Sequence, residues 1–227
     1  MMGPSHAAAG ALLWSVAAIP VTARLDIELT PATAVAGAFV AAGAGMLPDM
    51  DTPSSTVSRS FGPASQILAR GIGILSGGHR HATHSILFVL ATGVLTYAAV
   101  QAFGHNAALA IVFFLLGLAA RGFNLAPSAS TIQGWITTTT TAAVLTIIAA
   151  LIVPPEFWVA LPYIVAVGCF SHLLADAITP QGVPILWPLK SRLALPLLTR
   201  TGTTLETKLL MPAMLVGSIW LLAPQVA

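Results

Sequence analysis

Residues 157–178 read FWVALPYIVAVGCFSHLLADAI, an apolar run that carries no charged side chain until Asp176. A helix needs about 20 apolar residues to cross the hydrocarbon core of a bilayer, and this run is long enough. It also lacks the polar face that a helix on the surface of a soluble domain would show. The run therefore predicts a membrane-spanning helix whose last turns carry His172 and Asp176.

The rest of the chain has the same character. Of its 227 residues, 56% are hydrophobic and 7% are charged, and the mean hydropathy is +0.89. Backbone groups in lipid must be satisfied internally, and the alternating pattern of a barrel strand is absent. We expect an all-α, polytopic transmembrane bundle of about seven helices, forming a single domain over residues 1–227. The predicted spans are 7–23, 31–47, 84–103, 106–121, 132–153, 157–178 and 208–223.

Two of the predicted connections are long, residues 48–83 and 180–207, and both are rich in proline. Loops of this length are uncommon unless they are functional or disordered. Within the first, residues 65–75 predict a short amphipathic helix. Within the second, residues 183–198 form an apolar stretch typical of a membrane interface, with Trp187 near the headgroups.

The basic residues are distributed unevenly between the two sides of the predicted bundle. Only Arg24 falls on the side opposite the N-terminus. This bias predicts that the N-terminus and both long loops are cytoplasmic. Because the basic residues are scattered singly among apolar helices, we do not expect a nucleic-acid partner, and the predicted partners are membrane lipids. The residues on the N-terminal side are Arg59, Arg70, Arg80, Arg121, Lys190, Arg192, Arg200 and Lys208.

Side chains that can bind a metal lie at the ends of the apolar segments, and they include three of the four aspartates. An ionisable group at a membrane boundary is costly unless it is paired, ligated or functional. If the predicted helices cross the membrane in alternating directions, as assumed for the charge bias, all of these residues lie on the N-terminal side. The predicted ligands are His6, Asp49, Asp51, His79, His84, His172 and Asp176.

The spacing of these residues suits metal binding. His172 and Asp176 are four residues apart and share one face of a helix. Asp49 and Asp51 follow Pro48 directly and are separated by one residue. Mixed imidazole and carboxylate ligands suit Zn²⁺, Mn²⁺ or Fe²⁺ better than Ca²⁺ or Mg²⁺. Seven ligands are too many for one tetrahedral zinc. We therefore expect two divalent ions, zinc first, with manganese or iron as alternatives.

A pair of such ions activates a water for attack on a phosphoester. At a membrane face the natural phosphoester is a lipid headgroup, so we expect hydrolysis of a lipid or lipid-linked substrate. Asp49 or Asp51 would bridge the ions or accept the proton, and Arg80 would bind the substrate anion. Thr83 and Ser85 would orient the ligands through hydrogen bonds.

Three blocks also carry a family resemblance: PDMD at 48–51, HRHATHS at 79–85 and SHLLADAITPQG at 171–182. They resemble the signature blocks of the YdjM-like family, described as LexA-regulated, membrane-bound, metal-dependent hydrolases. The resemblance extends from His6 to about Pro188 and implies a bacterial inner-membrane protein with the seven ligands above. Thr179, in the last block, is expected to support the site. The family is distantly similar to zinc-dependent phospholipase C and P1-type nucleases.

Several alternatives remain open. His81 stands where the family usually has glycine, and it is either an extra ligand or a polar loop residue. The same ligands could form the transit site of a divalent-cation transporter or channel, or a polar cluster that joins helices in a scaffold. A transporter places its ligands near the midplane of the bilayer on broken helices. Here they lie at segment ends on one side, which favours an enzyme.

Overall fold

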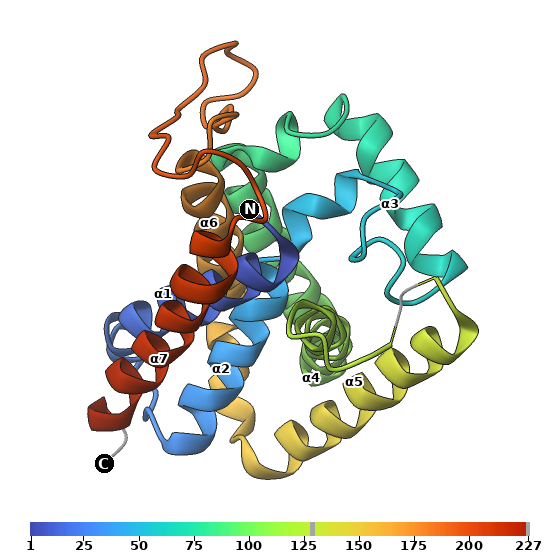
Figure 1. The fold of residues 1–227 in the computed structure, drawn as a ribbon. Coiled ribbons are helices and arrows are strands. Elements are labelled where there is room, and N and C mark those ends of the chain that lie inside the picture. The colour runs from blue at the N-terminus through green and yellow to red at the C-terminus, as the bar shows by residue number, and fades with distance from the viewer. Residues whose placement is uncertain (128–129, 226–227) are drawn as a thin grey trace.

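The computed structural model describes residues 1–127 and 130–225, and over this range the protein is built from helices (Figure 1). The only extended pairing there is one bridge between Val183 and Leu193. The predicted all-α architecture is confirmed. The helices are α1 (Gly3–Leu25), α2 (Pro31–Ala44), α3 (Pro63–Ser76), α4 (Ile86–Gly122), α5 (Ile132–Ile152), α6 (Leu161–Ala177) and α7 (Met211–Leu222), with short 3-10 turns η1 (Leu47–Asp51), η2 (Ala82–His84) and η3 (Pro155–Ala160) and a π-helical turn, Leu205–Leu210.

Within the described residues, six helical segments are long and apolar enough to cross a membrane. The exception among the seven helices is α3, which has 14 residues and corresponds to the amphipathic helix expected over 65–75. The six segments are Gly3–Leu25, Pro31–Asp51, Ile86–Gly122, Ile132–Ile152, Pro155–Ala177 and Leu205–Gln225.

Helix α4 accounts for two of the predicted spans. Its 37 residues would extend about 55 Å as one straight helix, nearly twice the hydrocarbon thickness. Gly104 interrupts it with φ 63° and ψ −146°, a conformation that favours glycine. Thr96 before the break and Ile111 after it line the same cavity, as do Thr92 and Leu115 further along. The two halves therefore run antiparallel, in agreement with the helices predicted over 84–103 and 106–121.

Helix α2 lies at the centre of the bundle and packs against α1, α4 and α6. Small residues permit this packing, because a Cβ at Gly43 would lie 1.9 Å from the Leu115 carbonyl oxygen. A Cβ at Gly10 or Gly168 would likewise lie 2.3 or 2.5 Å from the carbonyl oxygen of Ala41. Such residues let helix backbones approach closely in membranes. The end of α2 is thereby held firmly where the chain enters η1.

One end of the bundle, here called the N-terminal end, is where α1 begins and where α2 and α6 finish. The two long connections, residues 45–85 and 178–210, also lie at this end, in the upper part of Figure 1. Seven candidate ligands belong to these segments and to the adjoining helix ends. The fold thus places them on one side of the bundle, as predicted from the alternating direction of the helices.

The packing of α2 predicts that Gly43→Ala is strongly destabilising. Its Cβ would collide with the α4 backbone, and overpacking of this kind costs about 1–3 kcal/mol. We expect a clear fall in the thermal unfolding temperature in detergent. Gly93→Ala is the matched control within the bundle, since its Cβ would lie 3.5 Å from the Ala166 Cβ, an ordinary contact. Equal stability of the two variants would contradict the proposed packing.

Candidate metal centre

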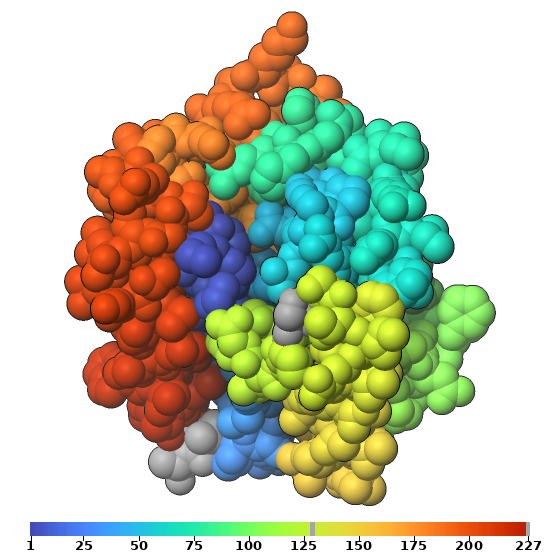
Figure 2. Space-filling view, turned by 45° about the vertical axis from the view of Figure 1, so that its right-hand side comes forward, coloured from blue at the N-terminus to red at the C-terminus, as the bar shows by residue number. Residues whose placement is uncertain are grey.

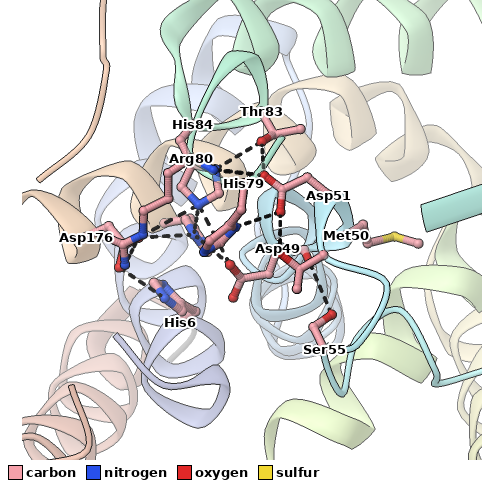
Figure 3. A network of polar contacts seen from close by, with 12 residues as sticks. His6, Asp49, Met50, Asp51, Ser55, His79, Arg80, Thr83, His84 and Asp176 are labelled. Atoms are coloured by element: carbon pink, nitrogen blue, oxygen red, sulfur yellow. Dashed lines mark hydrogen bonds and ion pairs between the residues drawn. The ribbon is translucent and has the colours of Figure 1, made fainter. Parts of the chain in front are cut away.

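The seven predicted ligand residues converge at the N-terminal end of the bundle, and Figure 3 labels all of them except His172. They come from the start of α1, from η1, from residues 77–85 and from the last turns of α6. The Nε2 atoms of His84 and His172 lie 3.3 Å apart, and the ring of His6 stacks on that of His172 at 3.6 Å between centroids. Segments up to 170 residues apart in the sequence therefore form a single cluster.

Within this cluster two groups of three side chains could each hold a metal ion. His6, His172 and Asp176 form one group, and Asp49, His79 and His84 form the other, with ligand atoms in each group within 4.8 Å of one another. The first group is buried. In the second, the side chains of His79 and Asp49 are 48% and 21% exposed. The cluster therefore has a closed side and a side open to solvent.

Hydrogen bonds donated by Nδ1 fix the orientation of three histidines. His172 Nδ1 donates to the Gly45 carbonyl at 2.7 Å, and His79 Nδ1 donates to Asp51 Oδ1 at 2.8 Å. The Thr83 hydroxyl donates to Asp51 Oδ2 at 2.6 Å, so it accepts from His84 Nδ1 at 3.0 Å. A neutral imidazole that donates through Nδ1 carries a lone pair on Nε2. The Nε2 lone pairs are therefore available to bind a cation.

The inward-facing atoms are spaced like the ligands of one cation. Asp49 Oδ1 lies 3.7 Å from Nε2 of both His84 and His172, and Asp176 Oδ2 lies 3.8 Å from both. Tetrahedral zinc with bonds of about 2.0–2.1 Å separates its ligands by about 3.3–3.4 Å. Without a cation these electron-rich atoms repel one another in a buried place. The donor set and its spacing fit a divalent metal centre.

Asp51 was predicted as a ligand, and the structure places it just outside both groups. It accepts hydrogen bonds from His79 Nδ1, from Thr83 and, at 3.2 Å, from the Arg80 backbone N–H. The hydrogen bond to Asp51 raises the pKa of the His79 imidazole. A carboxylate that receives the second nitrogen of a ligating histidine orients the ring and increases its basicity. The position of Asp51 fits this supporting role.

Arg80 contacts the centre through Asp176. Its Nη2 lies 2.7 Å from Asp176 Oδ2, and Nη1 donates to the Gly182 carbonyl at 3.3 Å. Its backbone is left-handed, with φ 57°, which is uncommon for a residue other than glycine. Thr179, predicted to support the site, donates to the backbone carbonyl of Asp176 at 2.7 Å. Both residues hold Asp176 in place.

Two other predicted positions lie next to the centre without contacting its ligand atoms. Ser85 accepts the Phe88 N–H at 3.3 Å and so caps the start of α4. His81 is exposed and its Nδ1 donates to the His79 carbonyl at 3.0 Å, as a polar loop residue would. Arg121 is buried at the end of α4 and donates to the carbonyls of Ala126 and Pro127.

Sequence reasoning missed the residues that fix the segment before His6. The Glu206 carboxylate is fully buried and accepts the N–H groups of Met2 at 2.6 Å and Gly202 at 2.8 Å. The Met1 nitrogen in turn contacts Asp176 Oδ1. A lone acid near the start of the last apolar segment was the available signal, but its partner Met2 lies 204 residues away in the sequence.

The fold and this cluster define a polytopic membrane protein with an internal histidine and aspartate site. A family model described as YdjM inner membrane protein matches residues 1–123 and 135–225, and the chain belongs to this family. It is 31% identical over 222 residues to the inner membrane protein YdjM of Escherichia coli strain K12, covering 94% of this chain and 82% of that protein. The Shigella flexneri protein of the same name gives the same values. No solved structure matches.

If Asp51 and Thr83 orient the ligands, Thr83→Val should weaken metal binding while the protein stays folded. Valine has the same shape but cannot join Asp51 to His84, and loss of such an orienting contact costs about 10–100-fold in affinity. Zinc affinity measured by competition with a chelating dye tests this expectation. The control is Thr56→Val, at an exposed position in the same connection. Unchanged affinity in Thr83→Val would rule out the orienting role.

Proposed function

We propose that this inner-membrane protein is a metal-dependent hydrolase that cleaves a phosphoester in a lipid or lipid-linked substrate. The observation that carries the proposal is the set of inward-facing Nε2 lone pairs and carboxylate oxygens around one point. While the imidazoles are neutral these four atoms do not attract one another, and of the four only Asp176 Oδ2 is paired with a guanidinium, that of Arg80. Their arrangement supports a metal centre, and a metal centre beside a bilayer supports phosphoester chemistry.

We propose two ions, one in each group of three ligands, with zinc preferred and manganese or iron possible by the same donor chemistry. When bound, the ions would polarise a water molecule and stabilise charge on the phosphoryl oxygens. Asp49 lies between the two histidines and the solvent, so its carboxylate is placed to accept a proton from that water. Asp51 keeps His79 aligned, and Arg80 keeps Asp176 in place while adding positive charge for the phosphate.

A lipid substrate is supported by an apolar cavity next to the centre. It measures about 300 Å³ and lies between α1, α6 and α7. Ala175, adjacent to Asp176 in the sequence, lines it together with Leu12 and Met214. An acyl chain in this cavity would keep its headgroup close to Asp176. Apolar residues of this kind bind hydrocarbon without any specific polar contact.

We further propose that the centre faces the cytoplasm. All the basic residues except Arg24 belong to segments at the N-terminal end, and an excess of lysine and arginine marks the cytoplasmic side. Substrate would then enter from the inner leaflet. Protease accessibility of residues 52–62 in right-side-out and inverted vesicles measures this orientation.

Metal stoichiometry tests the two-ion arrangement. Elemental analysis of the purified wild-type protein should give two divalent ions per chain. His6→Ala and His79→Ala should each reduce the value to about one, because each removes one ligand from a different group of three. A single ion that survives both substitutions would instead indicate only the central set of His84, His172, Asp49 and Asp176. A protein without any divalent metal would refute the centre.

Hydrolysis is tested with His172→Ala on phospholipids and lipid-linked phosphates in mixed micelles. Loss of this ligand should reduce product release by about two to three orders of magnitude, as for other groups that stabilise transition-state charge. His105→Ala is the control, since His105 is exposed beside the Gly104 reversal. Metal-dependent cation flux in proteoliposomes, with no hydrolysis of the panel, would identify a transporter instead.

A further inference from the structure

Between α6 and α7 the chain forms a projecting segment, residues 183–200, here called the arm. It extends beyond the bundle at the N-terminal end and is the orange segment at the top of Figures 1 and 2. Five of its six leucine side chains face outward, with exposed fractions of 41% to 75%. A stretch this apolar is unfavourable in water. The exposed leucines are Leu186, Leu189, Leu193, Leu195 and Leu197.

The charges on the arm are all positive. Lys190, Arg192 and Arg200 are exposed, and residues 177–205 contain no aspartate or glutamate. Outward-facing leucines interspersed with basic residues are typical of elements that lie in the headgroup region of an anionic membrane. Neither property alone would point to lipid, but the arm combines them.

The arm has a fixed attachment to the bundle. Within the arm, Val183 and Leu193 exchange two backbone hydrogen bonds of 2.9 Å, and the Leu195 N–H attaches the arm to the bundle by donating to the Ala177 carbonyl of α6 at 2.7 Å. Leu198 is buried and packs with Ala175. Arg192 also donates to the Arg80 carbonyl at 3.4 Å, which connects the arm to the metal centre. The outward direction of the leucines is therefore part of the folded shape.

Charge complementarity identifies the surface that the arm fits. The chain has seven acidic residues. Four of them, at the N-terminal end, belong to the metal centre or are buried: Asp49, Asp51, Asp176 and Glu206. The exposed ones, Asp26, Glu28 and Glu156, lie next to the far ends of α1 and α6. At this end a second copy of the chain thus offers the arm only the partly exposed carboxylate of Asp49, whereas anionic lipid offers many negative charges.

We propose that the arm docks on anionic phospholipid headgroups in the leaflet at the N-terminal end, with its leucines in the acyl boundary. Its basic residues bind the phosphates, and the contact from Arg192 to Arg80 places these lipids beside the metal centre. The docking does not depend on the proposed hydrolysis, because none of the basic residues on the arm is a candidate ligand.

Fluorescence in nanodiscs tests the docking. The full chain carrying Leu189→Cys, in a Cys169→Ala background, is labelled with an environment-sensitive dye and reconstituted in phosphatidylcholine with or without phosphatidylglycerol. We expect a blue shift, and quenching by nitroxide-labelled lipid, only with phosphatidylglycerol and only at low salt. The variant Lys190→Gln/Arg200→Gln should lower the ratio of docked to undocked arm about fivefold for each charge removed.

A dye on Ser54→Cys, an exposed position in the other connection at this end, is the control and should respond to neither lipid. Equal signals in the two lipid compositions, or no effect of removing both charges, would overturn the proposal. A blue shift that requires two chains per nanodisc would also overturn it in favour of a second copy. Neither metal content nor hydrolysis is measured, so failure here is distinct from failure of the proposed function.

Discussion

Close backbone contact around α2 is the constraint on which the candidate metal centre depends. The helix is so rich in alanine and glycine that its backbone approaches those of α1, α4 and α6 directly. At its end, a Cβ on Gly45 would lie 2.7 Å from the His6 carbonyl, and the Gly45 carbonyl itself accepts from His172. The chain then enters η1, which carries Asp49. One packing constraint thus sets the relative positions of ligands from three segments.

The direction of the hydrogen bonds distinguishes this cluster from a polar network that only joins helices. The Gly45 carbonyl cannot donate, so His172 Nδ1 must, and its Nε2 lone pair is obligatory while the ring is neutral. A neutral His84 could donate through Nε2 to that lone pair only if Thr83 turned its hydroxyl proton toward His84 Nδ1. Asp51 Oδ2 would then lose a donor 2.6 Å away. A cation between the rings satisfies every group without this loss.

The sequence predicted the helices, the amphipathic α3 and the gathering of ligands at one end, because these follow from apolar length, periodicity and charge. It did not predict the difference between Asp49 and Asp51, which both follow Pro48. Their roles diverge because residues 79–83 fold over η1 and donate hydrogen bonds to Asp51, while Asp49 faces His84 and His172. The predicted spans 7–23 and 31–47, which became α1 and α2, are rich in alanine and glycine. Their small residues serve helix contacts and make the segments less hydrophobic than lipid-facing ones.

Charge at the N-terminal end links the proposed metal binding to the proposed anionic substrate. Around the centre, the carboxylates of Asp49, Asp51 and Asp176 outnumber the single guanidinium of Arg80, so the empty cluster would repel a phosphate. Two divalent cations would reverse the sign of this region, while the surrounding exposed charges are basic already. An anion could then approach from the side where Asp49 and His79 are exposed. Anionic substrates are therefore compatible with the metal-loaded centre and incompatible with the empty one.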